Sequence, residues 1–256
     1  MVAKFVSNPS DYYSESLQSS RLWHFWLPLT AFALIPQLAF YEPEFFDRWL
    51  ASERTGLLEF VHFLLPLLTA IIALRLLCSP IIQQDRWLVL WCSAMAIGGI
   101  YLSGEEASWG QHYIGWSTPE FWQQVNDQQE TNLHNVSNLL DQLPRAILQA
   151  GIVITGTLYP VLLLTRPGFL PRRFNFLYPP VALAPLATLV AACWGYRALH
   201  KYTAFGDFLT YRPGEFQELF IVWFLFYYAL FLLWREQRER QEQQQRYGSK
   251  GGKAQP

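Results

Sequence analysis

Charged residues are scarce in this chain. Of its 256 residues, only 15% are Asp, Glu, Lys or Arg, whereas 52% are hydrophobic and 17% are aromatic. The formal net charge at pH 7 is −1, so the excess of basic residues on which nucleic-acid binding depends is missing. We therefore expect no nucleic-acid partner.

Cysteine is rare, and several familiar catalytic motifs are missing. The three cysteines, Cys78, Cys92 and Cys193, are odd in number and all lie within apolar stretches. This pattern supports neither a disulfide framework nor a zinc cluster, and it predicts buried small side chains. The sequence also has no glycine-rich phosphate loop, no serine- or cysteine-nucleophile motif, no internal repeat and no strand-like alternation of polar and apolar residues.

The sequence does contain long apolar runs. Each has about the length needed to cross a hydrocarbon layer roughly 30 Å thick, and a backbone in lipid must satisfy its own hydrogen bonds. We predict an all-α integral membrane protein with about six transmembrane helices, at 22–40, 57–78, 86–104, 146–165, 178–199 and 217–234. The six-helix domain would span 22–235, between a polar segment at 1–21 and a charged tail at 236–256 whose end is disordered.

The basic residues predict an orientation for these helices. The first run follows a polar segment and is not followed by a small-residue cleavage site, which indicates an anchor and not a cleaved signal peptide. Thirteen of the 19 Lys and Arg residues lie in segments on the same side as both termini. Because basic residues favour the cytoplasmic side, we predict a multi-pass cell-membrane protein with both termini in the cytoplasm.

The Glu and His residues gather at the opposite, outer ends of the predicted helices. The second span begins with Glu59 and His62, which are three residues apart and therefore share a helix face. The third span ends in Glu105 and Glu106, and the last begins with a further acidic pair. The remaining candidates on this side are His112, Glu130, His134, Glu215 and Glu218.

The segment 105–145 connects the third and fourth spans and is predicted to form an interfacial or re-entrant helical loop. Ser117, Thr118 and Pro119 form a helix-start pattern before a short aromatic stretch. A second helix from Asp127 would place Glu130 and His134 one turn apart. That helix could cover a polar cavity in which the outer Glu and His residues find partners, since unpaired ionisable groups at membrane depth are costly.

Pairs of Glu and His at helical spacing are typical of metal sites in helical bundles. The candidate ligands are Glu59, His62, Glu105, Glu106, His112, Glu130, His134 and Glu218. This mixture of oxygen and imidazole ligands favours Fe, Mn or Zn as a divalent metal cofactor. The candidate catalytic residues are Glu105, Glu106, Glu130 and His134. The alternatives are local: a hydrogen-bonded pair at a helix end, a solvated helix face, or the ordinary preference of helix starts for acids.

One segment resembles a known group of proteins. Residues 105–135 carry E-E-x-x-W-G-Q and then N-x-Q-x-E-T-N-x-H-N. This resembles the signature of a family of bacterial polytopic membrane proteins of unassigned function. The resemblance implies a site in this segment without naming a reaction.

Three functions remain open from the sequence. The first is a metal-dependent membrane hydrolase or oxidoreductase that acts on a membrane lipid or lipid-linked substrate at the outer leaflet, with a glutamate as general base. The second is a proton- or ion-coupled transporter, although acids clustered near one face are unlike the midplane site of most carriers. The third is a structural or assembly subunit whose outer loop docks a partner protein.

Overall fold

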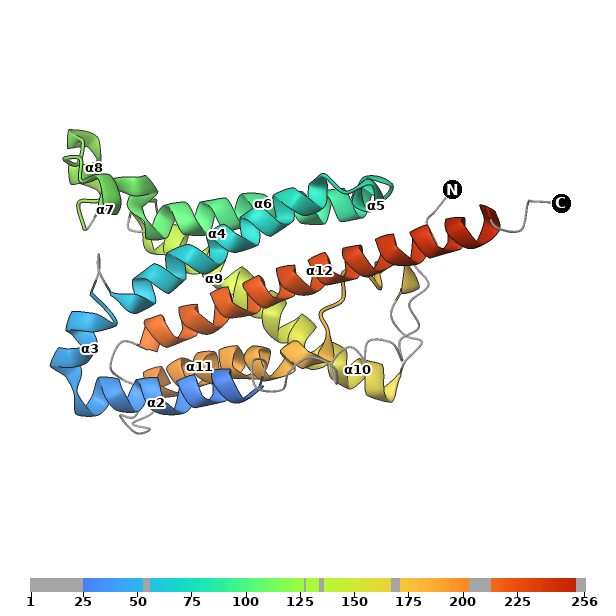
Figure 1. Cartoon of the computed structure of the whole chain (residues 1–256). Coiled ribbons are helices and arrows are strands. Elements are labelled where there is room, and N and C mark those ends of the chain that lie inside the picture. Colours follow the sequence, from blue (N-terminus) through green and yellow to red (C-terminus); the bar gives the residue numbers. More distant parts are fainter. Residues whose placement is uncertain are drawn as a thin grey trace.

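The computed structural model describes residues 25–52, 56–126, 128–133, 136–166, 171–202 and 213–251, all of them helical or irregular. In chain order the helices are α2 (Leu27–Tyr41), α3 (Pro43–Trp49), α4 (Leu57–Leu77), α5 (Pro80–Gln83), α6 (Arg86–Glu106), η2 (Ser108–Gly110), α7 (Gln111–Ile114), α8 (Glu120–Val125), α9 (Asn138–Val153), η3 (Ile154–Leu158), α10 (Tyr159–Thr165), η4 (Arg172–Phe174), η5 (Val181–Leu183), α11 (Ala184–Tyr202) and α12 (Pro213–Gly251). Figure 1 shows the long helices running side by side along one direction.

Five helical stretches within the described residues are long and apolar enough to cross a membrane. They are Leu57–Leu77, Arg86–Glu106, Gln142–Leu162, Val181–His200 and Gly214–Gln245. The predicted all-α membrane fold is confirmed, and the chain is a multi-pass membrane protein. The first predicted span corresponds to α2, which has 15 residues and, at about 1.5 Å per residue, is shorter than the hydrocarbon layer.

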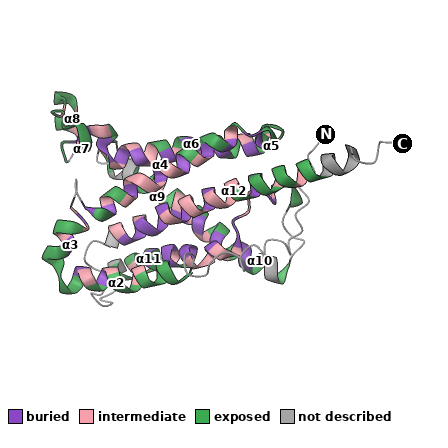
Figure 2. Cartoon of the chain, in the orientation of Figure 1, coloured by how far each residue is buried: buried purple, intermediate pink, exposed green. Residues whose placement is uncertain are grey.

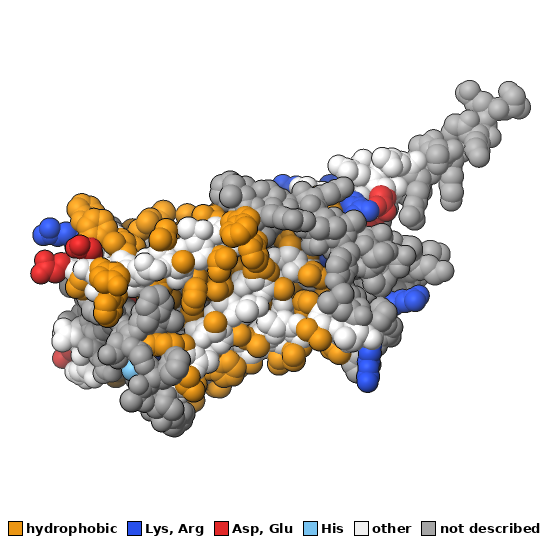
Figure 3. Space-filling model, turned by 90° about the horizontal axis from the view of Figure 1, so that it is seen from below, with side chains coloured by type: hydrophobic (Ala, Val, Ile, Leu, Met, Phe, Trp, Pro, Cys, Tyr) orange, Lys and Arg blue, Asp and Glu red, His pale blue; other side chains and the backbone are white. Residues whose placement is uncertain are grey.

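The outer surface of the bundle is apolar, as a lipid-facing surface must be. Large side chains such as Leu90, Ile97 and Ile71 are exposed on the long helices. In the view of Figure 3, hydrophobic side chains cover the middle of the molecule, and the charged side chains that are coloured lie towards its two ends. A water-soluble protein would expose polar residues over this whole surface.

Helices α4 and α6 form an antiparallel pair, and α12 packs against α4 on one side and α11 on the other. The pair is close because α6 presents Gly99 to α4. A Cβ atom at Gly99 would lie 2.7 Å from the carbonyl oxygen of Pro66 and 3.0 Å from Cβ of Ala70. Because the two helices are antiparallel, the start of α4 lies beside the end of α6.

The fourth span is interrupted. It consists of α9, the π-helical turn η3 and then α10, which has Pro160 in its first turn. Proline has no N–H group to donate, so it disturbs the regular backbone hydrogen bonds of the turn before it. The turn lies against α11 at Gly156, where a Cβ would come within 2.3 Å of Cβ of Ala187. The helix begins at Asn138, earlier than the predicted start of the span at 146.

Helix α12 has 39 residues, which at about 1.5 Å per residue is roughly twice the thickness of the hydrocarbon layer. Its first part is buried in the bundle and its last part projects from it (Figure 2). Where it leaves the bundle, buried Glu236 accepts a hydrogen bond of 2.6 Å from Ser79 Oγ. The helix continues to Gly251, further than the sequence predicted, and residues 252–256 and 1–24 lie outside the described part of the chain.

Candidate metal centre

Five acidic and imidazole side chains from three helices meet at one end of the bundle. They are Glu59 and His62 at the start of α4, Glu106 at the end of α6, and Glu215 and Glu218 at the start of α12. We call them the carboxylate–histidine cluster. They meet because α4 lies between α6 and α12, with its first turn beside the last turn of α6 and the first turns of α12.

His62 lies at the centre of this cluster and is only 1% exposed. Its Nδ1 is 3.8 Å from Glu215 Oε2 and 3.9 Å from Glu218 Oε2. Neither ring nitrogen makes a hydrogen bond of normal geometry with any described residue, although the backbone of Glu215 lies near the ring. A buried imidazole without hydrogen bonds is costly, so its surroundings fit a ligand that binds nitrogen.

The distances suit a metal ion. Two ligand atoms at about 2.1 Å from one ion lie at most about 4.2 Å apart, and the His62–carboxylate separations fall within that limit. Two overlapping triplets have ligand atoms within 4.8 Å of one another: Glu59, His62 and Glu215, and then His62, Glu106 and Glu218. His62 belongs to both, so the buried Glu and His residues could hold a metal ion.

The charges in this region also favour a cation. Arg145 on α9 donates to Glu218, with 2.7 Å between Nη2 and Oε1. This end of the membrane-spanning bundle therefore contains four carboxylates, one guanidinium group and one imidazole. Negative charges that are partly removed from water repel one another unless protons or a cation neutralise them.

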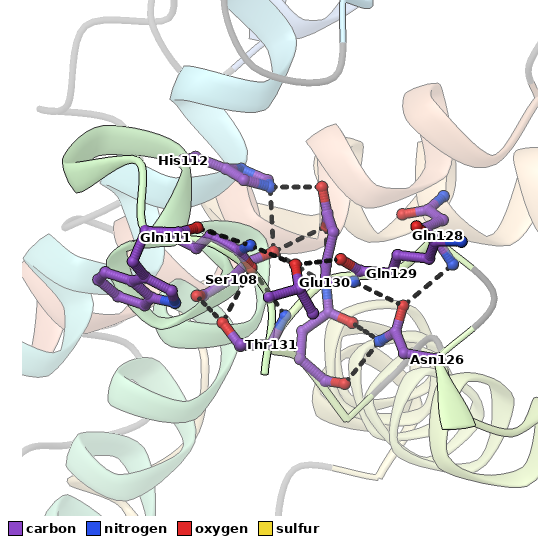
Figure 4. Close-up of polar contacts among 11 residues, drawn as sticks. Ser108, Gln111, His112, Asn126, Gln128, Gln129, Glu130 and Thr131 are labelled. Atoms are coloured by element: carbon purple, nitrogen blue, oxygen red, sulfur yellow. Dashed lines mark hydrogen bonds and ion pairs between the residues drawn. The ribbon is translucent and has the colours of Figure 1, made fainter. Parts of the chain in front are cut away.

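A second polar group lies beyond the end of α6. Its members are Glu105, Ser108, His112, Glu130 and Asn132, which we call the loop network. Figure 4 labels Ser108, His112 and Glu130 of this network. Ser108 Oγ donates to Glu130 Oε2 at 2.7 Å. Asn132 Nδ2 donates to the same carboxylate oxygen at 3.0 Å, and His112 Nε2 lies 2.8 Å from Glu130 Oε1. The Glu130 carboxylate is thus satisfied by three side chains.

The loop network is not a nucleophilic triad, although it contains Ser, His and Glu. In such triads the serine and the acid bind opposite nitrogens of the imidazole. Here Nε2 of His112 approaches both Ser108 Oγ, at 3.0 Å, and Glu130 Oε1. Ser108 is also 0% exposed, so no substrate could reach its hydroxyl group.

Glu105 fixes the chain reversal that follows α6. Its Oε1 accepts from the indole N–H of Trp109 at 2.7 Å, and its Oε2 accepts from the backbone N–H of Leu133 at 2.6 Å. The backbone of Ser108 and Trp109 is left-handed, with φ of 44° and 55°, which is strained for residues other than glycine. The hydrogen bonds of Glu105 and of the loop network hold this strained turn in place.

The predicted helix from Asp127 is wrong, because residues 128–133 are not helical. The side chain of Asn126 replaces helical hydrogen bonds: its Oδ1 accepts from the backbone N–H of Gln128 and of Glu130, at 3.0 and 3.1 Å. Asparagine commonly competes with the backbone in this way. Gln129 has a left-handed φ of 55°, which also ends any helix at this point.

The candidate residues from the sequence thus divide between two groups. Glu59, His62, Glu106 and Glu218 lie in the carboxylate–histidine cluster, whereas Glu105, His112 and Glu130 lie in the loop network. His134 lies outside the described residues.

Two residues at this site were not selected from the sequence. Glu215 joins the cluster although the sequence did not select it as a ligand, and Arg145 was missed. An arginine at the edge of the fourth apolar run was the available signal.

Tyr113 on α7 connects the loop to the rim of the cluster. Its ring packs on Phe63, the residue after His62, with 5.2 Å between ring centroids. Partial burial, and after it the negative charge of Glu59, raises the pKa of the Tyr113 hydroxyl. Tyr113 therefore remains protonated at neutral pH and keeps its O–H group as a hydrogen-bond donor.

Comparisons with protein family models, curated proteins and solved structures find no match to this chain. The resemblance of residues 105–135 to a family signature therefore stays a prediction.

Proposed function

We propose that this chain is a metal-dependent membrane enzyme that acts on a lipid or lipid-linked substrate, with the carboxylate–histidine cluster as its metal centre. The observation that carries the proposal is the environment of His62. Both of its ring nitrogens are buried without a hydrogen bond of normal geometry to a described residue, and carboxylates from three helices surround them. Metal coordination would satisfy the imidazole and neutralise the acids in one step.

The ligand types narrow the choice of metal. With Glu59 left free of the metal, the carboxylates of Glu106, Glu215 and Glu218 and the imidazole of His62 suit Fe, Mn or Zn better than Ca, which takes oxygen ligands alone. Bound there, such an ion would polarise a substrate oxygen or lower the pKa of a water molecule. Glu59 is the carboxylate of the cluster whose negative charge helps to raise the pKa of Tyr113, after the burial of the tyrosine. We assign Glu59 the role of general base, with Tyr113 as a hydrogen-bond donor to the substrate.

The depth of the cluster supports a lipid substrate. Glu59 and His62 are the third and sixth residues of α4, which places them within about 8 Å of the start of the helix. For a helix that begins at the membrane surface, this is the depth at which lipid headgroups meet the acyl chains. The distribution of Lys and Arg favours the outer leaflet for this end and the cytoplasm for both termini.

An ion-coupled transporter is the second candidate, and one observation favours it. The fourth span is broken by the π-helical turn Ile154–Leu158, and interrupted helices are common in carriers. Against it, the cluster lies at the end of the helices and not near their middle. Arg145 on the interrupted span reaches Glu218, so movement of that span would change the charges around His62.

The substrate class can be tested without knowing the substrate. The purified full chain, loaded with Fe, Mn or Zn, would be reconstituted into vesicles of a total membrane lipid extract, and the lipids would be compared by mass spectrometry. We expect a metal-dependent change in one lipid class with wild type and with Glu44→Gln, a change of an exposed acid on α3 at the same end. Glu106→Gln should abolish it. If the lipids stay unchanged and the vesicles show metal-independent, proton-driven flux, the result contradicts the enzyme and supports the transporter.

A further inference from the structure

Two arginines, Arg86 and Arg173, lie over one tryptophan at the end of the bundle opposite the carboxylate–histidine cluster, and Arg172 precedes Arg173 in the chain. Arg86 is the first residue of α6, and Trp87 follows it. Arg172 and Arg173 lie in η4, in the connection between α10 and α11. The packing of Trp87 against Phe174 of η4, with 6.2 Å between ring centroids, brings these two parts of the chain together.

Two guanidinium groups lie on the same indole ring. The Cζ atoms of Arg86 and Arg173 are 5.5 and 5.2 Å from the centroid of the Trp87 ring. Arg173 is also 5.3 Å from the ring of Phe174. The cation–π interactions hold the two positive charges near each other, although like charges repel.

No carboxylate neutralises these arginines within the described residues. Arg86, Arg172 and Arg173 are exposed and take part in no ion pair there. The nearest acid in sequence, Asp85, accepts from the backbone N–H of Trp87 at 2.8 Å and so caps α6. Residues 167–170, which precede η4 and are not described, contain no acid.

Arg238 also lies over a tryptophan but, unlike the arginines at Trp87, it has a carboxylate partner among the described residues. Its Cζ atom is 5.7 Å from the ring centroid of Trp234. Its carboxylate partner is Glu242, with 3.2 Å between Arg238 Nε and Glu242 Oε1. Among the described residues, the group at Trp87 therefore has no anionic partner such as the one at Trp234.

We propose that Arg86, Arg172 and Arg173, together with Trp87, bind the headgroup phosphate of an anionic phospholipid. Arg86 begins a membrane-spanning helix, so the group lies at the depth of the headgroups in its leaflet, where tryptophan is also favoured. A guanidinium group matches the geometry of phosphate oxygens and can bind two of them at once. Basic groups between spans are known lipid-headgroup sites. This site does not depend on the proposed metal chemistry.

Native mass spectrometry of the purified full chain tests the proposal. The protein would be titrated with phosphatidylglycerol and with phosphatidylcholine of the same acyl chains. Wild type should bind phosphatidylglycerol more tightly. The double substitution Arg172→Gln/Arg173→Gln should weaken that binding by about fivefold for each arginine removed. Arg238→Gln is the matched control and should leave it unchanged.

Three outcomes would overturn the proposal: equal binding of the two lipids by wild type, an unchanged affinity in the double variant, or displacement of the lipid by excess inorganic phosphate. Displacement would mean that free phosphate, and not a lipid, is the ligand. If the double variant does not fold, Arg86→Gln can replace it in the same lipid titration, since Arg86 is exposed on a different helix. It should weaken phosphatidylglycerol binding by about fivefold.

Discussion

Adjacent glutamates at the end of α6 have different surroundings. Glu105 accepts hydrogen bonds from Trp109 and from the backbone of Leu133, and it holds the chain reversal that leads into the loop network. Glu106 is grouped instead with His62 and Glu218. Successive residues on a helix point about 100° apart, so one helix end can serve both a structural and a ligand-binding purpose.

This difference predicts different effects of two isosteric substitutions. Glu105→Gln should lower the stability of the purified protein by about 2 kcal/mol, because a charge-assisted hydrogen bond is lost and an amide N–H₂ faces a donor. Glu106→Gln should leave thermal stability nearly unchanged in metal-free protein and reduce metal affinity. Thermal unfolding in detergent and metal titration measure the two quantities. Reduced metal affinity in Glu105→Gln, together with reduced stability in Glu106→Gln, would contradict these two roles.

The sequence predicted that Glu and His residues gather at one end of the bundle. It did not predict that they divide into two groups. Charge distribution and helical spacing indicated that Glu59, His62, Glu106 and Glu218 lie at one end of the bundle. Which of Glu105 and Glu106 faces α4 depends on the rotation of α6, which is set by tertiary packing at contacts such as Gly99. No local pattern in the sequence carries that information.

At the scale of elements, the interrupted fourth span brings Arg145 to the cluster. The span consists of α9, η3 and α10, and its π-helical turn packs closely on α11 through Gly156. Hydropathy predicted the apolar core of this span but not its interruption, because a π-helical turn has no hydropathy signature. Likewise the side-chain hydrogen bonds of Asn126, and not hydrophobic periodicity, decide that residues 128–133 form a loop.

Two glycines of this span should respond differently to the same substitution. Gly156→Ala would place a Cβ 2.3 Å from Cβ of Ala187, and the resulting displacement of α11 should cost about 2 kcal/mol. Gly151→Ala would meet nothing within 4 Å and should be neutral or stabilise the helix by up to about 1 kcal/mol. Thermal unfolding of both variants tests this. Equal melting temperatures would contradict the close approach of η3 and α11.

At the scale of the whole molecule, the two ends of the bundle differ in charge and in chemistry. One end holds the carboxylate–histidine cluster and the loop network, and the other holds Arg86, Arg172, Arg173 and the projecting part of α12. An apolar surface separates them. If this surface lies in lipid, the two ends face different compartments, and a substrate would reach the cluster from one leaflet only.

The proposed orientation predicts which positions a membrane-impermeant thiol reagent can label in intact cells. In a cysteine-free background, Glu44→Cys on α3 should be labelled, because it is exposed at the end that holds the cluster. Gln245→Cys, exposed on the projecting part of α12, should react only after the cells are opened. Labelling of Gln245→Cys in intact cells would invert the orientation and move the cluster to the cytoplasmic leaflet.

The proposed metal centre consists of His62 and the carboxylates that surround it. The most direct measurement is the metal content of the detergent-purified full chain by elemental mass spectrometry, after loading with Fe, Mn or Zn and removal of excess metal. Wild type should retain stoichiometric metal, and so should the Glu44→Gln control. His62→Ala should lose it while keeping its helical circular dichroism. Metal-free wild type after all three loadings, or undiminished metal in folded His62→Ala, would show that His62 does not bind metal.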